Sequence, residues 1–168
     1  MGRETQLQAF PNDWPLVRQV QSGECSGDLL QTACHYLCWL RRQCYLDRRF
    51  EVLRYLLTES APDDSTRRLY EMAIDGSGPI HPQATATQGH PICWSDADTT
   101  KRIHAAISSV EFSSLAAHFG TAKFLAAELY KKSLERREVP ALHAYFWELK
   151  EYYREATQAN CGTLVLID

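Results

Sequence analysis

Apolar residues recur at intervals of three and four along much of the chain, a spacing that places side chains on one face of an α-helix. The first such stretch predicts a helix over residues 28–44. A second predicted helix begins at Asp47, whose carboxylate is placed to cap it. Because the connection between the two stretches is very short, we expect these helices to pack as an antiparallel hairpin.

The same spacing predicts further helices downstream. One covers residues 65–74, and another follows Ser95, whose hydroxyl is expected to cap it. A helix is predicted from Thr121 to about Arg137, and Pro140 begins the last one in a first turn, where proline is tolerated. The apolar stripe of this last helix consists of Leu142, Tyr145, Phe146, Leu149, Tyr152, Tyr153 and Ala156.

Strand patterns are fewer and shorter. Residues 1–27 are the hardest to interpret, although residues 5–10 predict a short strand. Residues 79–94 combine prolines, glycines and small polar residues into a long loop that ends in a brief strand. The apolar, β-branched segment 163–168 predicts a strand at the centre of a sheet. The sequence therefore predicts an α+β fold, a helix-rich single domain over residues 1–168 with a small mixed sheet that includes the C-terminal strand.

Length and charge limit the classes of function. A chain of 168 residues suits one domain, and 18 basic against 21 acidic residues give a formal net charge of −3. This balance supplies no basic field to attract nucleic acid, so no nucleic-acid partner is expected. Apolar runs are far too short to cross a bilayer, and residues 1–10 lack a signal-peptide pattern. We therefore expect a cytoplasmic protein with no membrane partner.

Six cysteines are the unusual feature of the composition. Cys34, Cys38 and Cys44 fall on the first predicted helix, where free cysteine packs as a small apolar side chain. Their spacing does not match that of zinc or iron–sulfur ligands, and the sequence has no histidine pattern of a metalloenzyme. We therefore expect reduced thiols, no metal site and no cofactor.

Cys93 and His90, at the end of the long loop, are the candidates for catalysis. An imidazole close to a thiol can activate it as a nucleophile. The sequence offers no third group to orient the histidine, and the acidic residues at 63–64 and 96–98 have a local role at helix starts. We therefore favour a protein that is not an enzyme. The alternative is an enzyme or small-molecule-binding protein that uses residues 79–94.

Aromatic, acidic and arginine side chains are the candidates for binding a partner. Large aromatic residues contribute much of the binding energy of protein interfaces. Acidic residues lie beside the aromatic residues here, whereas an RNA-binding surface would carry lysine and arginine at such positions. Arginines add planar guanidinium groups, which bind carboxylates by their fork. The candidate partner-binding residues are Trp147, Tyr153, Glu148, Glu151, Arg48 and Arg49.

Several segments of the chain are similar to motifs of one known bacterial family. Residues 45–58, YLDRRFEVLRYLLT, are similar to its LDK-W-x-x-LHYLLT helix, and residues 73–80, AIDGSGPI, to its AI-x-GG-x-x-I turn. Residues 146–156, FWELKEYYREA, resemble its F-x-x-LK-x-FY-x-x-A helix, and residues 164–168 its terminal strand. On these motifs the chain resembles the YfbM-like family, a bacterial family of domains of unknown function, over residues 45–168. The resemblance implies a compact, helix-rich α+β domain and brings no catalytic residue to this chain.

The sequence thus predicts a small bacterial protein that acts by protein–protein binding. Proteins of this size and type resemble the small immunity proteins encoded beside bacterial toxins, so a cognate toxin that the chain neutralises is the expected partner. This hypothesis depends on the aromatic and acidic last helix and on the lack of a catalytic constellation in the sequence.

Overall fold

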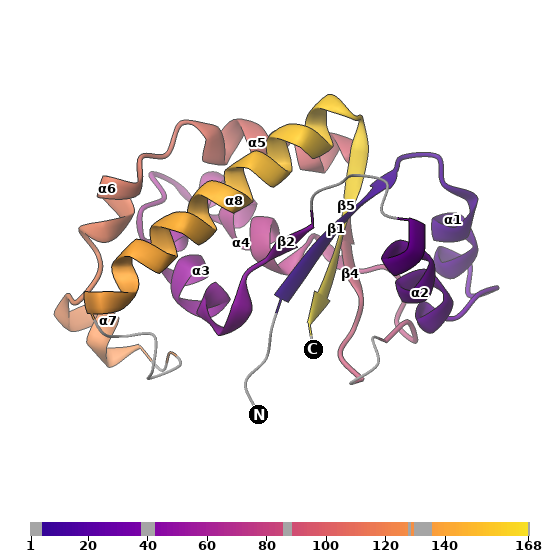
Figure 1. The fold of residues 1–168 in the computed structure, drawn as a ribbon, viewed down its shortest axis with the longest axis horizontal. Helices are drawn as coiled ribbons and strands as arrows, with labels where there is room; N and C mark the ends of the chain where they lie inside the picture. The colour runs from indigo at the N-terminus through magenta and orange to yellow at the C-terminus, as the bar shows by residue number, and fades with distance from the viewer. Residues whose placement is uncertain (1–4, 38–42, 86–88, 128, 130–135, 168) are drawn as a thin grey trace.

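The chain is described here from a computed structural model, which covers residues 5–37, 43–85, 89–127, 129 and 136–167 (Figure 1). The strands of the described residues are β1 (Thr5–Pro11), β2 (Cys44–Tyr45), β3 (Gly78–Pro79), β4 (Cys93–Ser95) and β5 (Cys161–Ile167). The helices are α1 (Pro15–Gln21), α2 (Gly27–Leu37), α3 (Phe50–Glu59), α4 (Asp64–Asp75), α5 (Ala97–Ser108), α6 (Phe112–Ala116), α7 (Ala122–Ala126) and α8 (Val139–Gln158). Within the same residues, the short 3-10 helices η1 (Asp47–Arg49) and η3 (Arg136–Glu138) precede α3 and α8.

The strands form one sheet in the order β2-β1-β5-β4-β3. The α+β class and the central position of the C-terminal strand are confirmed. Each pairing between the described strands is antiparallel, whereas we expected a mixed sheet. Neighbouring strands are mostly far apart in the sequence, and local hydrophobic patterns do not fix the relative direction of such strands.

Alternate residues of the central strands face opposite sides of the sheet. Leu7 and Val165 point to a larger core formed with α3, α4, α5 and α8, whereas Phe10 and Leu164 point to a smaller core beneath α1 and α2. Figure 1 shows α1 and α2 on one side of the sheet and the other labelled helices on the opposite side. β5 is therefore buried on both faces, as its continuous apolar sequence predicts.

The predicted hairpin of the first two long helices is wrong. α2 ends at Leu37 and residues 38–42 lie outside the described part of the chain, but Cys44 lies in β2 rather than in a helix. α2 belongs to the smaller core and α3 to the larger one, so the sheet separates them. Cys44 is buried, and burial suits a helix stripe and a strand equally, so its hydrophobic pattern could not distinguish the two.

The cap of α5 differs from the predicted one by a single residue. Asp96, not Ser95, accepts a hydrogen bond from the backbone N–H of Thr99 at 2.7 Å. Ser95 is buried in β4, and its hydroxyl lies 2.9 Å from that of Ser77, where the chain leaves α4. A carboxylate reaches the free N–H groups of a first turn as well as a hydroxyl does, so adjacent Ser and Asp residues compete for this position.

The last third of the chain contains a short helix and a long one. α7 covers five residues of the helix expected from Thr121, while residues 128 and 130–135 lie outside the described part. α8 begins beside Pro140 and buries the predicted apolar stripe, apart from the half-buried Tyr145. No helix among the described residues is long and apolar enough to cross a membrane.

The loop predicted over residues 79–94 is attached to the fold at several points. β3 pairs with β4, and an isolated bridge joins Thr85 to Pro91. A Cβ placed on Gly27, the first residue of α2, would lie 2.9 Å from the backbone oxygen of Thr85, so the helix and the loop approach closely. Residues 86–88 lie outside the described part.

Gly162 in β5 has no room for a side chain. A Cβ at this position would overlap the ring of Phe10 and lie 2.7 Å from the backbone oxygen of Ser95. We expect Gly162→Ala to lower the free energy of unfolding by about 1–3 kcal/mol, because β5 must shift or Phe10 must leave its rotamer. Urea denaturation of the purified variant measures the loss.

Phe10→Leu provides the control, because it removes ring atoms that the added methyl group would meet. The double variant should therefore lose less stability than the two single variants lose together. A Gly162→Ala variant as stable as the wild-type chain would contradict the close packing of β5 against its neighbours.

Candidate functional site

Cys93 lies in β4 and packs against the larger core. It stands opposite Val165 in the sheet, and its Cβ lies close to Gly76 at the end of α4. Burial, together with the nearby carboxylate of Asp75, raises the pKa of the Cys93 thiol. Catalytic cysteines need the opposite environment, in which positive charge favours the thiolate.

His90 does not complete a catalytic pair with Cys93. No hydrogen bond joins these two side chains within the described residues. The long loop does line a pocket of about 270 Å³ together with residues 23–27, but the histidine in that pocket is His81. Neither Cys93 nor His90 is among the described residues that line this pocket.

Tyr153 serves the interior of the fold. It is fully buried, and its hydroxyl donates a hydrogen bond to the backbone oxygen of Ala73 at 3.0 Å. That oxygen lies in the last turn of α4, where the N–H of Ser77 donates to Trp94 instead of continuing the helix. Tyr153 thus satisfies a terminal carbonyl of α4 and is not available to a partner.

Trp147 borders a groove between α6 and α8, which we call the aromatic groove. The groove has a volume of about 330 Å³, and its apolar lining includes Phe112, Phe146 and Trp147. The ring of His143 stacks on that of Phe112, with centroids 4.5 Å apart and planes 16° apart. Because Trp147 is 51% exposed, the groove presents aromatic surface to solvent.

Charged side chains surround the aromatic groove. The Nζ of Lys150 donates to the backbone oxygen of Val110 at 3.1 Å and lies 5.4 Å from the ring centroid of Phe146, within the range of a cation–π interaction. This ammonium therefore fixes one wall of the groove. The carboxylates that line the groove belong to Glu111 and Glu151.

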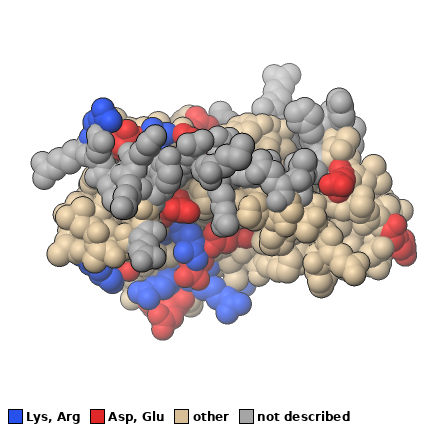
Figure 2. Space-filling model, turned by 90° about the horizontal axis from the view of Figure 1, so that it is seen from below, with Lys and Arg blue, Asp and Glu red and all other residues tan. Residues whose placement is uncertain are grey.

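The two acidic residues of α8 that were named as binding candidates, Glu148 and Glu151, differ in their surroundings. Glu151 lines the aromatic groove and accepts a hydrogen bond from Arg154 at 2.7 Å, which neutralises part of its charge. Glu148 is half-buried and is not part of the groove lining. Figure 2 shows one further face, on which basic and acidic side chains lie intermixed over part of the described surface.

Arg49 joins two segments of the chain. Its Nε donates to Glu138 at 2.7 Å and its Nη1 to Asp47 at 2.6 Å, while the guanidinium lies 5.7 Å from the ring centroid of Tyr145. The hydrogen bond to Glu138 raises the pKa of Arg49.

Asp47, which we expected to cap α3, binds Arg49 instead and does not cap that helix. Arg48 lies in η1, and its side chain falls outside the description.

Among the residues that line the aromatic groove, sequence reasoning named Trp147 and Glu151 as binding candidates and missed the others. His143 and Lys150 stand four residues before and three residues after Trp147, so helical spacing could have placed them on the same face. Phe112 offers no such signal, because its position depends on how α6 packs against α8.

We expect Tyr153→Phe to lower the free energy of unfolding by about 1–3 kcal/mol, because the buried oxygen of Ala73 loses its partner. Tyr145→Phe, on the same helix but half-buried, is the matched control and should change stability little. Equal effects of the two changes in urea denaturation would contradict the role given to Tyr153.

The Tyr153→Phe variant also tests how the free energy of unfolding depends on pH. Burial raises the pKa of the Tyr153 hydroxyl far above its ordinary value, so the folded chain keeps a proton that the unfolded chain loses above a pH of about 10. The stability that this group contributes is present below that pH and is lost as the pH rises. Tyr153→Phe should therefore reduce the alkaline loss of stability.

We expect Cys93 to react with iodoacetamide more slowly in the folded chain at pH 7.5 than in urea. Its raised pKa lowers the thiolate fraction, and about tenfold less thiolate forms for each unit of increase. Residue-resolved mass spectrometry separates Cys93 from the other thiols. Faster alkylation in the folded state would favour the catalytic alternative.

Comparisons with known proteins identify the family. The family model for a domain of unknown function, DUF1877, matches residues 5–166. A search of curated proteins finds no similar sequence. The fold is similar to the crystal structure of YfbM from Escherichia coli, a protein of unknown function, with a TM-score of 0.67 and 16% identity over 98% of this chain and 99% of that one. The family match confirms the resemblance to YfbM-like proteins that the sequence motifs predicted, and the chain therefore belongs to the DUF1877 family.

Proposed function

We propose that this chain is a bacterial cytoplasmic protein that acts by binding another protein through the aromatic groove. The observation that carries the proposal is the half-exposed Trp147 beside the stacked rings of Phe112 and His143. Tryptophan is among the side chains that most often dominate a protein interface. The proposal retains one of the sequence candidates, Trp147, as the anchor of binding.

The arrangement of the groove suits a partner side chain that inserts from outside. Phe146 is buried and fixed in the larger core, so the floor of the groove is rigid. Lys150 is held by Val110, which limits how far the wall of the groove can move. A preformed surface loses little conformational entropy on binding, and this favours affinity.

The charges around the groove indicate the chemistry of the partner. Glu111 and Glu151 contribute carboxylates to the lining, while the ammonium of Lys150 is already turned toward a backbone oxygen and an aromatic ring. A partner segment with an apolar side chain flanked by lysine or arginine therefore complements the groove. Such flanking charges mainly steer association and fix orientation.

A finer form of the proposal is that the partner is a toxin that this chain neutralises. The support for it is the small size of the chain and its likeness in type to immunity proteins encoded beside toxins. Binding alone can neutralise a toxin by covering its active surface, so the proposed function requires no catalytic residue of this chain.

A photo-crosslinking amino acid in place of Trp147 tests the proposal in bacterial cells that express the chain. Position 147 should capture one protein, and the same group in place of Leu29, which is 49% exposed on α2, should not. We expect Trp147→Ala to bind the purified partner at least tenfold more weakly, a loss of about 1.4 kcal/mol, in calorimetry. Leu29→Ala should bind like the wild-type chain.

Growth assays test whether the captured partner is a toxin that this chain neutralises. Cells that express the captured partner alone should stop growing, and the wild-type chain should restore growth better than Trp147→Ala does. A partner that is harmless supports protein binding and overturns the neutralising role. A partner that binds Trp147→Ala and the wild-type chain equally overturns the proposed surface.

A further inference from the structure

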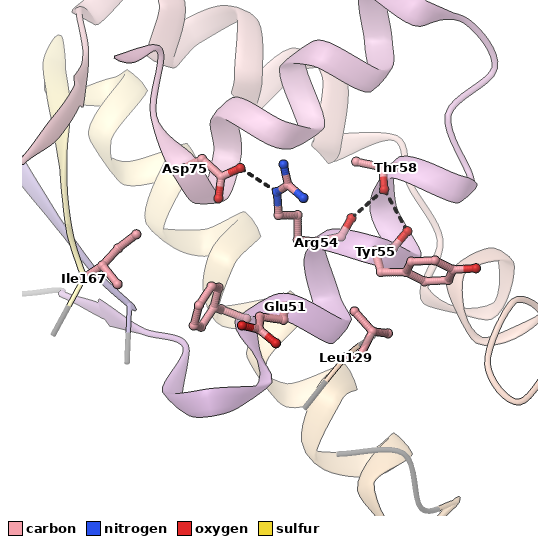
Figure 3. Close-up of a pocket in the computed structure, with 8 residues that line it drawn as sticks. Glu51, Arg54, Tyr55, Thr58, Asp75, Leu129 and Ile167 are labelled. Carbon is pink, nitrogen blue, oxygen red and sulfur yellow. Dashed lines mark hydrogen bonds and ion pairs between the residues drawn. The ribbon is translucent and has the colours of Figure 1, made fainter. Parts of the chain in front are cut away.

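A further pocket, whose described lining shares no residue with the aromatic groove, is independent of the proposed function. It has a volume of about 440 Å³, within the range of small-molecule sites. Figure 3 shows it between α3, the end of α4 and the end of β5. Its lining residues are Phe50, Glu51, Arg54, Tyr55, Thr58, Asp75, Leu129 and Ile167.

Arg54 offers a fixed guanidinium at one end of this pocket. Its Nε donates a hydrogen bond of 2.5 Å to the Oδ2 of Asp75, and the two side chains come from different helices. Within the described contacts, the terminal nitrogens of Arg54 make no hydrogen bond. Because one edge of the planar fork is held by Asp75, the other edge is oriented to take a second carboxylate.

Glu51 supplies a carboxylate to the same pocket. It precedes Arg54 by three residues on α3, a spacing that places both side chains on one face of the helix. Such a pair often forms an ion pair, but here the guanidinium turns to Asp75, and Figure 3 shows Glu51 at a distance from it. The carboxylate of Glu51 can therefore bind a cationic group of a ligand.

The wall between these charged ends is apolar. Phe50 is nearly buried, and Ile167 at the end of β5 is half-buried, so both present carbon surface to the pocket. The hydroxyl of Tyr55 points away from Arg54 in Figure 3. The interior of the pocket thus has one carboxylate-binding group, one ammonium-binding group and a hydrocarbon surface.

We propose that this pocket binds a small α-amino acid with an apolar side chain. The ligand carboxylate binds the outer edge of Arg54, its ammonium group binds Glu51, and its side chain covers Phe50 and Ile167. The charges favour a ligand with an ammonium group: Arg54, Asp75 and Glu51 together carry one net negative charge when both acids are ionised, so an anion without an ammonium group is disfavoured.

Calorimetry with the full chain tests the proposal with four probes. L-leucine carries all three recognised features. N-acetyl-L-leucine lacks the ammonium group, and 3-methylbutylamine lacks the carboxylate. We expect saturable binding of L-leucine and at least tenfold weaker binding of the other two. In the dipeptide leucyl-alanine the two charges lie further apart, so it should bind more weakly than L-leucine. Tighter binding of the dipeptide would overturn the free amino acid as the ligand in favour of a short peptide.

Variants test the assigned residues. Glu51→Gln and the double variant Arg54→Gln/Asp75→Asn should each weaken L-leucine binding at least tenfold. The double change removes the ion pair as a unit, so no half-buried carboxylate is left without a partner. Arg67→Gln, on the exposed face of α4, and Glu24→Gln, in the turn after α1, are the matched controls and should bind like the wild-type chain.

Thermal unfolding of each variant establishes that it is folded before binding is measured. The proposal is overturned if L-leucine does not bind, if N-acetyl-L-leucine binds as tightly, or if Glu51→Gln binds like the wild-type chain. Because Trp147 lies outside this pocket, Trp147→Ala should keep L-leucine binding. Failure of the amino-acid site therefore leaves the protein-binding proposal untouched, and the reverse also holds.

Discussion

The rest of the fold depends on the pairing of β1 with β5. Seven residues of each strand pair in antiparallel register, and they come from opposite ends of the chain. Alternation along both strands divides the side chains between two cores, so a slip by one residue would exchange the contents of those cores. Gly162 fixes the register further, because only a residue without a side chain fits against Phe10 at that point. α5 and α8 pack directly on β5, and α4 and α6 pack in turn on those two helices, so the larger core is built on the surface that the two strands create together.

The register of β5 also determines which face of α8 is available to a partner. Thr163 points to the larger core, where its hydroxyl accepts a hydrogen bond from Tyr152 at 3.3 Å. Tyr153 extends the contact to α4 through Ala73. These two buried tyrosines fix the rotation of α8 about its axis, and the opposite rotation is excluded because their hydroxyl groups would lose partners. Trp147 is thereby left at the surface, so its exposure is a consequence of the interior hydrogen bonds.

Those parts of the fold that depend on one continuous segment could be predicted from the sequence. The stripe of α8 and the apolar strand β5 each carry a strong periodic signal. Cys44 shows where this reasoning ends, because the strand it occupies exists only through pairing with Leu7 on the distant β1. The same limit applies to the candidate sites. Trp147 could be named from its type and position, whereas Phe112 enters the aromatic groove through packing that no local pattern encodes.

The arginines illustrate why composition alone does not define a site. Arg49 and Arg54 lie five residues apart, and both pair with a carboxylate, yet their surroundings differ. Arg49 has acidic partners at three of its nitrogens, Nε, Nη1 and Nη2, and an aromatic ring nearby, so its hydrogen-bonding capacity serves the contact of η1 with the start of α8. Arg54 uses only its Nε in the described contacts and opens onto a pocket. A guanidinium has five donors, and the number already engaged within the chain decides whether it can recognise a ligand. That count depends on the three-dimensional arrangement of the acids, and the neighbouring sequence does not reveal it.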